Sequence, residues 1–195
     1  MIIIIILLIL LILYKLDIIN SNWNWNKVYV KSNIDNREYL VLNKDDKDIA
    51  ANQLALLRKK LKQFVKDLKN KYPSDEKILR LNVRFRPDNF SEGSADGSYT
   101  SYSINKGEKI IFCIRQRNEK NDIIDINTIT FVALHELSHV MTLSIGHEKE
   151  FWDNFRFLLK EAINMNIYKY QAFHLYPQKY CGITITNTPY KVNKI

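Results

Sequence analysis

The residues best suited to chemistry form a short motif, His135-Glu136-Leu137-Ser138-His139. If this segment is helical, the two histidines stand one turn apart on the same face and can both bind one metal ion. Glu136 then points about 100° around the helix, where it reaches a water on the ion rather than the ion itself. Zinc would lower the pKa of that water, and Glu136 would take its proton before attack on a carbonyl. The spacing therefore predicts a zinc-dependent hydrolase with Glu136 as general base.

The surroundings of the motif favour a bound metal. Apolar residues precede it at 129–134 and follow it at 140–143. Two imidazoles and a carboxylate are costly to bury in such a helix without a partner. The alternative, two histidines in a core or on a solvated helix face, leaves this motif unexplained.

A catalytic zinc ion needs a third protein ligand and one open position. His147 lies eight residues beyond His139, about 12 Å along a straight helix, so the helix must end between them. Gly146 is placed to let the chain turn back, which would bring His147 to the ion at the start of the next helix. Glu148 and Glu150 are the alternative ligands.

Two helices are predicted to carry these ligands. The first runs from about residue 127 to Ile145, and Gly146 stops it. The second begins near His147, and acidic residues occupy its first turn. Its buried face is predicted to comprise Phe151, Phe155, Leu158, Leu159 and Ala162.

The N-terminal part of the body, residues 28–73, is predicted to form a hairpin followed by a long helix. Val28–Lys31 and Tyr39–Leu42 flank a turn candidate and predict the hairpin. From Asp46, apolar residues recur at spacings of three and four, which predicts a helix that Pro73 ends.

The middle of the chain predicts strands. Leu81–Phe85 alternates apolar with polar residues and predicts a half-buried strand, whereas Asp88–Ser98 is rich in Ser, Gly and Asp and predicts a loop. Tyr99–Asn105 and Lys109–Arg115 predict two strands joined around Lys106–Gly107. The order of helix, strands, helix and helix predicts an α+β fold.

The first 14 residues are hydrophobic without interruption, and extension through residue 19 gives about 27–28 Å of helix. This length is close to a bilayer core of about 30 Å. An uncleaved single-pass membrane anchor at residues 1–19 is expected, with a cleaved signal or a soluble buried segment as alternatives. The positive-inside rule places the body on the cytoplasmic side, because the basic residues nearest the run all follow it: Lys15, Lys27 and Lys31.

The composition behind this run is that of a globular domain. The chain is 46% hydrophobic and 26% charged, which excludes a disordered polyelectrolyte and a multi-pass membrane protein. One domain over residues 38–195 is expected, with residues 20–37 as a linker or short hairpin. The net charge is +8, and Arg58–Lys71 carries seven basic side chains against one acidic. That segment is either a solvated helix face or a docking surface for nucleic acid or an anionic membrane.

The remaining candidate residues point to no further site. Cys113 and Cys181 are too few for a disulfide framework and lie in no CxxC pair, so a reducing compartment fits them. His174 has no partner at ligand spacing and is expected to be structural.

The motif and the Gly-His-Glu-Lys-Glu-Phe-Trp sequence at 146–152 together resemble the WLM and SprT-like zinc metallopeptidases, particularly those encoded by large DNA viruses. The stretches at 99–108 and 180–185 also resemble these viral metallopeptidases. The second and third histidines are further apart than in typical WLM members. The resemblance implies a minimal zincin-like domain whose edge strand, Tyr99–Asn105 or Lys109–Arg115, binds an extended peptide. It implies one Zn²⁺ held by His135, His139 and His147, with Glu136 as the base.

Three functions follow from these features. The first is a membrane-anchored zinc metallopeptidase that cleaves a protein or peptide. The second is a non-catalytic membrane or virion structural protein that zinc stabilises. The third is a DNA-associated protease acting on protein–DNA complexes, with Arg58–Lys71 as its electrostatic footprint.

Overall fold

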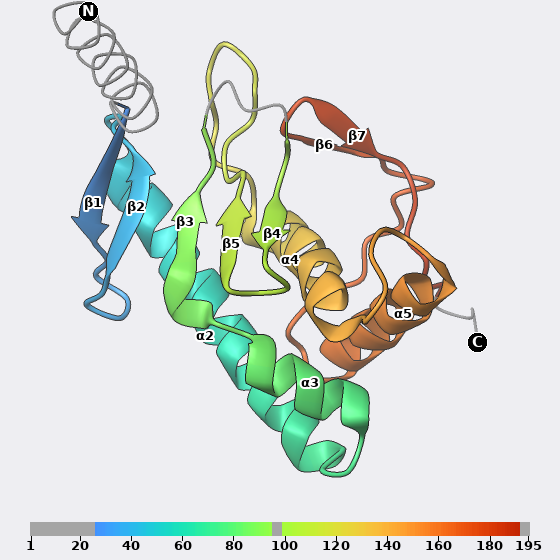
Figure 1. Cartoon of the computed structure of the whole chain (residues 1–195). Helices are drawn as coiled ribbons and strands as arrows, with labels where there is room; N and C mark the ends of the chain where they lie inside the picture. Colours follow the sequence, from blue (N-terminus) through green and yellow to red (C-terminus); the bar gives the residue numbers. More distant parts are fainter. Residues whose placement is uncertain (1–25, 95–98, 192–195) are drawn as a thin grey trace, which may run out of the picture.

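The computed structural model describes residues 26–94 and 99–191, in which a five-stranded mixed sheet packs against helices (Figure 1). The predicted α+β class is confirmed. The elements are β1 (Lys27–Lys31), β2 (Glu38–Leu42), α2 (Lys47–Lys71), α3 (Glu76–Arg84), the 3₁₀ turn Pro87–Asn89, β3 (Phe90–Glu92), β4 (Tyr102–Ile104), β5 (Lys109–Phe112), α4 (Ile126–Met141), α5 (Lys149–Asn164), β6 (Gln178–Tyr180) and β7 (Ile183–Ile185).

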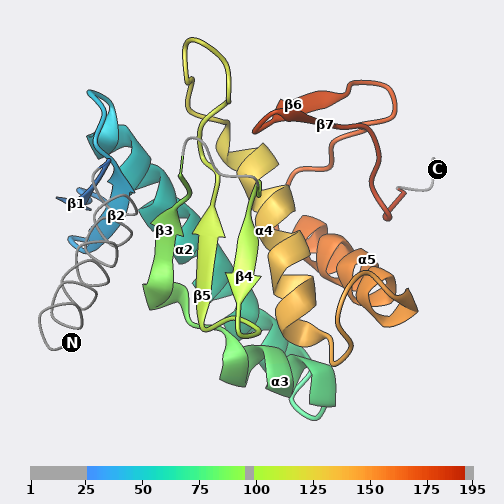
Figure 2. The ribbon, with the colours of Figure 1, turned by 45° about the horizontal axis from the view of Figure 1, so that its top comes forward.

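The sheet has the order β1-β2-β3-β5-β4, so β4 is an edge strand (Figure 2). The predicted hairpin is confirmed, because β1 and β2 pair antiparallel with Val30 opposite Tyr39. Strand β3 runs parallel to both of its neighbours, while β4 returns antiparallel to β5 with Ser103 opposite Ile110. Helix α4 packs at the end of the sheet formed by β4 and β5, with β4 at the edge (Figures 1 and 2).

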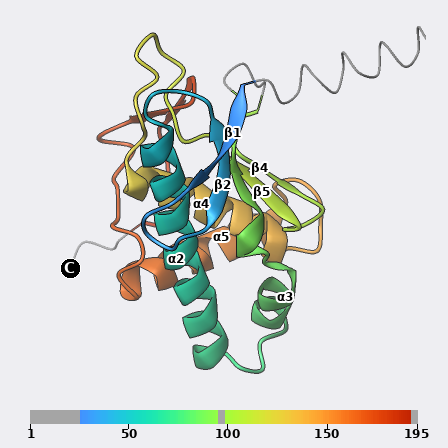
Figure 3. The same cartoon turned by 90° about the vertical axis from the view of Figure 1, so that its left-hand side faces the viewer.

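Helix α2 confirms the helix predicted between Asp46 and Pro73. Its apolar residues form one buried stripe, because spacings of three and four bring them to the same side. Figure 3 shows this helix beside the β1–β2 hairpin, with α3 returning along its C-terminal half. The fully buried members of the stripe include Leu54, Leu57, Leu61, Phe64 and Leu68.

The predicted strand at Leu81–Phe85 is wrong, because its first four residues belong to helix α3 and Phe85 directly follows that helix. The Asp75 carboxylate caps the helix by accepting hydrogen bonds from the amides of Lys77 and Ile78. Ile78 and Leu81 are buried at helical spacing, whereas Val83 is 63% exposed. A short alternation of apolar and polar residues is compatible with the period of a strand and with that of a helix. The capping residue Asp75 favours the helix.

The predicted loop at Asp88–Ser98 is also wrong in part, because strand β3 lies in the middle of the sheet. Its polar residues are buried rather than solvated. The Glu92 carboxylate accepts hydrogen bonds from the amide of Leu42 at 2.7 Å and from Arg115 Nε at 2.6 Å. Burial raises the pKa of Glu92 despite these partners. Composition alone therefore misassigns a core strand whose polar groups have partners in the tertiary structure.

The two predicted C-terminal helices are confirmed, with a correction at the first boundary. Helix α4 ends at Met141 instead of continuing to Ile145, and Thr142 is extended. Helix α5 begins at Lys149 and buries the predicted apolar face. The connection of residues 142–148 is therefore longer than the sequence predicts.

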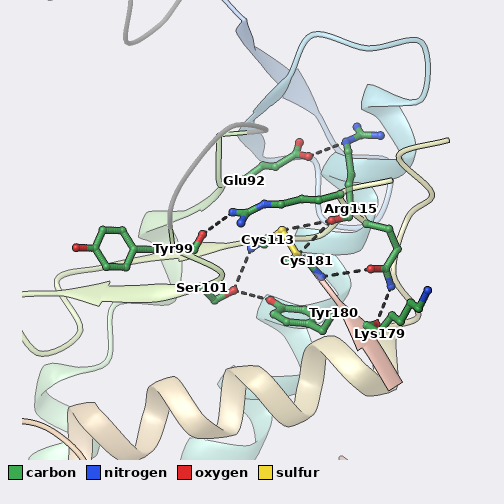
Figure 4. The surroundings of a disulfide bond; sticks show 10 residues. Glu92, Tyr99, Ser101, Cys113, Arg115, Lys179, Tyr180 and Cys181 are labelled. Carbon is green, nitrogen blue, oxygen red and sulfur yellow. Dashed lines mark hydrogen bonds and ion pairs between the residues drawn. A yellow bond between two sulfur atoms is a disulfide. The ribbon is translucent and has the colours of Figure 1, made fainter. Parts of the chain in front are cut away.

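The two cysteines form a disulfide bond, which corrects the expectation of reduced thiols (Figure 4). The bond joins Cys113, directly after β5, to Cys181 in the β6–β7 turn. Their sequence separation is 68, so only the tertiary structure brings the two Cα atoms to 6.3 Å. The disulfide ties the C-terminal hairpin to the sheet.

The predicted membrane anchor at residues 1–19 lies outside the described residues. Within the described ranges 26–94 and 99–191, no helix combines the length and apolar character needed to cross a bilayer.

Candidate active site

The structure brings the three predicted histidines together. His135 and His139 stand one turn apart on α4, and His147 comes from the connection to α5. The Nε2 atom of His147 lies 3.1 Å from that of His139 and 3.2 Å from that of His135. One ligand atom from each residue falls within 4.8 Å of the others.

The donor set fits a zinc ion. Three nitrogens bound tetrahedrally at about 2.0–2.1 Å from zinc are separated by about 3.3 Å, close to the observed spacings. Burial, followed by the charge of the neighbouring histidines, lowers the pKa of His135 to about 3. Burial likewise lowers the pKa of His139 to about 4. Both imidazoles are therefore unprotonated at neutral pH, as metal ligands must be.

The two alternative ligands face elsewhere. The Glu150 carboxylate lies 3.4 Å from the amides of Leu143 and Ser144, and hydrogen bonds to these amides lower its pKa against the effect of burial. Arg80 Nη1 lies 3.8 Å from the same carboxylate. Glu148 occupies the position before the first turn of α5, and its side chain makes no capping hydrogen bond. Among the described residues, neither glutamate belongs to the group of side chains that could hold a metal ion.

Glu136 is only 4% exposed and lies between α4 and strand β4. Its carboxylate accepts a hydrogen bond from the backbone N–H of Ser103. Burial raises the pKa of Glu136 to about 7, although this hydrogen bond acts in the opposite direction. The side chain borders the same cleft as the histidines.

A cleft of about 550 Å³ runs between the histidine group and strand β4. Of the two strands that the resemblance offered, Tyr99–Asn105 contains the edge strand at this cleft, while β5 lies inside the sheet. An edge strand has main-chain groups that can pair with an extended peptide. The residues that line the cleft from the strand side are Thr100, Ser101, Tyr102, Ser103, Asn105 and Lys106.

The turn between β4 and β5 holds the C-terminal end of α4. Lys106 Nζ donates to the carbonyl oxygens of Thr142 at 3.2 Å and Ser144 at 2.5 Å. Gly107 has a φ of +105°, and a Cβ atom there would lie 2.9 Å from the side chain of Val140. Burial, followed by the charge of Arg84, lowers the pKa of Lys106. Sequence reasoning missed this lysine, because nothing local distinguishes it from any other turn residue.

The buried residue Tyr180, in strand β6, contacts Ser101, which directly precedes strand β4 (Figure 4). Tyr180 Oη lies 2.6 Å from Ser101 Oγ, which also accepts a hydrogen bond from the amide of Cys113 at 3.0 Å. Because Cys113 is bonded to Cys181, the C-terminal hairpin and the cleft strand form one connected unit. His174, by contrast, is exposed and lies outside the metal-binding group.

This chain is similar to a known domain family and to proteins of large DNA viruses. The model of the WLM domain matches residues 96–192. An uncharacterized protein of Acanthamoeba polyphaga mimivirus is 37% identical over 161 residues, which cover 80% of this chain and 81% of that protein. An uncharacterized protein of Invertebrate iridescent virus 6 is 35% identical over 69 residues, covering 35% of this chain and 38% of the relative.

Two solved structures are also similar. Wss1 from Saccharomyces cerevisiae has a TM-score of 0.45 and 22% identity, over 65% of this chain and 88% of that one. A Wss1 mutant from S. pombe has a TM-score of 0.43 and 26% identity, over 63% of this chain and 92% of that one. From the match over the histidine motif and the mimivirus relative, this chain belongs to the WLM-domain family, in a group found in large DNA viruses.

Proposed function

We propose that this chain is a zinc-dependent peptidase that cleaves an extended segment of protein lying along strand β4. The observation that carries the proposal is the meeting of three histidine nitrogens with a buried glutamate at the edge of a sheet. His135, His139 and His147 would hold the ion. When bound, zinc polarises a carbonyl and makes a water more acidic.

The chain's own groups perform the remaining tasks. The outer edge of β4 aligns the substrate backbone, as in other complexes formed by strand addition. Glu136 faces the cleft and takes a proton from the attacking water. At the same time the oxygen of the water bonds to the carbonyl carbon. The same carboxyl group returns the proton to the leaving amine as the carbon–nitrogen bond breaks. Glu136 therefore serves as base and then as acid.

Zinc-dependent cleavage of a defined peptide mixture tests this proposal. The zinc-loaded full chain is incubated with the mixture, and mass spectrometry identifies new termini. Cleavage should disappear with a chelator and return with added zinc. If chelation unfolds the domain and no peptide is ever cut, the chain is instead the zinc-stabilised structural protein.

We further propose that residues 1–19 anchor the enzyme in a membrane with its domain on the cytoplasmic side. The support for this proposal is the uninterrupted apolar run and the lysines that follow it. Expression in cells followed by alkaline extraction should leave the full chain in the membrane pellet, and deletion of residues 1–19 should release it. Release of the full chain by alkali would contradict the anchor.

A second candidate function is proteolysis of protein–DNA complexes. Four exposed lysines follow one side of α2 at spacings of three and four, which suits a polyanion. DNA binding should then weaken steeply with salt, and replacing these lysines with glutamine should reduce the salt dependence. Absence of binding at low salt would remove this candidate. The four residues are Lys59, Lys62, Lys66 and Lys69.

A further inference from the structure

We infer that a second cavity beside the histidine group receives one large apolar side chain of the substrate, next to the bond that is cut. The inference rests on the proposed peptidase function and adds the class of side chain that the site selects. The cavity measures about 390 Å³ and lies between α4, α5 and the segment that follows β7. Its lining includes Phe131, His135, Trp152, Phe155, Thr188 and Pro189.

Aromatic rings form one part of the wall. Phe131 and Phe155 are buried, with ring centroids 5.3 Å apart. Trp152 is 40% exposed, and its ring lies 6.5 Å from that of Phe155. Aromatic walls of this kind attract apolar and aromatic groups.

The lining of the cavity carries little charge. Arg156 is the single Arg, Lys, Asp or Glu residue in the lining. Its Nη1 atom donates to Asp153 at 2.9 Å, and its Nε atom donates to the carbonyl oxygen of Pro189 at 3.2 Å. A charged substrate side chain would lose water here against a lining in which seven of the eight residues are not Arg, Lys, Asp or Glu, so an uncharged apolar one is preferred.

Size and position suit a side chain of the substrate. A cavity of about 150 Å³ accepts benzene, so the space here accommodates an aromatic ring or a leucine side chain. His135 lines both this cavity and the cleft along β4, so the two spaces meet at a proposed metal ligand. A peptide that lies on β4 and passes over the histidines can therefore direct a side chain beside the cut bond into the cavity.

Blocked octapeptides of glycine and serine, each with one central Phe, Leu, Ala or Asp, test this selection. The zinc-loaded full chain should cut next to the varied residue, with kcat/KM for Phe or Leu at least about 10-fold above that for Ala. The Asp peptide should be the poorest substrate. Mass spectrometry identifies the bond, and quenched-fluorescence versions give the rates.

Binding to the zinc-loaded Glu136→Gln protein separates selection from catalysis. By calorimetry, this variant should bind the Phe peptide about 10-fold more tightly than the Ala peptide. Adding Trp152→Ala, which removes a wall, or Thr188→Phe, which fills the space, should bring the two affinities closer together. Leu175→Ala removes an exposed apolar side chain outside the cavity lining and serves as the matched control.

The outcomes distinguish this inference from the proposed function. If no peptide is cut but the binding preference persists and depends on Trp152 or Thr188, the peptidase assignment fails and the apolar pocket stands. If the Phe and Ala peptides are bound and cut equally, the inference is overturned. It is also overturned if both cavity variants retain the full preference for Phe.

Discussion

Lys106 Nζ lies 2.5 Å from the carbonyl oxygen of Ser144, a contact between the β4–β5 turn and the segment that carries His147. Arg80, on helix α3, donates to the carbonyl oxygen of Met141 at 2.8 Å. Cations thus satisfy carbonyl groups that the end of α4 leaves without helical partners. The position of the third histidine therefore depends on side chains outside the histidine motif.

Replacing Lys106 with methionine should weaken zinc binding by about 10-fold or more, since outer residues that orient metal ligands have effects of about 10- to 100-fold. The reason is that the 142–146 segment loses the hydrogen bonds to two of its carbonyl groups. Competition with a chromophoric chelator measures the affinity, and circular dichroism of the metal-free protein checks its folding. The exposed Lys120→Met serves as control. An unchanged zinc affinity would show that the segment holds its position without Lys106.

Replacing Glu136 with glutamine should keep one zinc ion per chain and reduce cleavage by about 100- to 10,000-fold, the usual contribution of a general acid–base group. The amide preserves the shape of the side chain but cannot take a proton. Metal analysis and peptide cleavage on the same sample measure the two effects. The exposed Glu148→Gln should retain activity. Substantial cleavage by Glu136→Gln would assign the base to another residue.

Replacing His147 with alanine should lower zinc affinity by at least about 100-fold, because a ligand contributes more than the residues that orient it. Glu150→Gln should have a smaller effect, since Glu150 contacts the amides of the preceding segment. Metal content after dialysis against a weak chelator measures both. An unchanged zinc content in His147→Ala would move the third ligand to Glu148 or Glu150.

Replacing both cysteines with serine should lower the free energy of unfolding by about 4 kcal/mol, the chain-entropy estimate for a disulfide that closes a loop of this length. The bond joins residues separated by 68 positions, so it restricts a large part of the unfolded chain. Urea unfolding measures the change with the metal content held constant. A reductant should lower the midpoint of the original chain and leave that of the variant in place. Equal midpoints for the original chain with and without reductant would contradict a stabilising disulfide.

Features set by short-range periodicity could be predicted from the sequence. The helical spacing in α2, the paired strands β1 and β2, and the one-turn separation of His135 and His139 depend on neighbours within a few residues. Gly146, which has a φ of +84°, similarly marks the turn that leads to His147, although helix α4 ends earlier, at Met141. These elements identify the candidate site because its first two histidines and its glutamate lie on one helix.

Features set by long-range contacts could not be predicted in this way. The partners that make Glu92 a core residue, Leu42 and Arg115, lie far from it in sequence, and so Asp88–Ser98 reads as a loop. The disulfide, the contacts of Lys106 and the second cavity likewise join distant segments. Sequence alone predicted His135, His139 and His147 as zinc ligands and Glu136 as the base. Tertiary structure decided which strand faces these residues, what contacts the segment that carries His147 and where a second cavity lies, because packing between distant elements sets those positions.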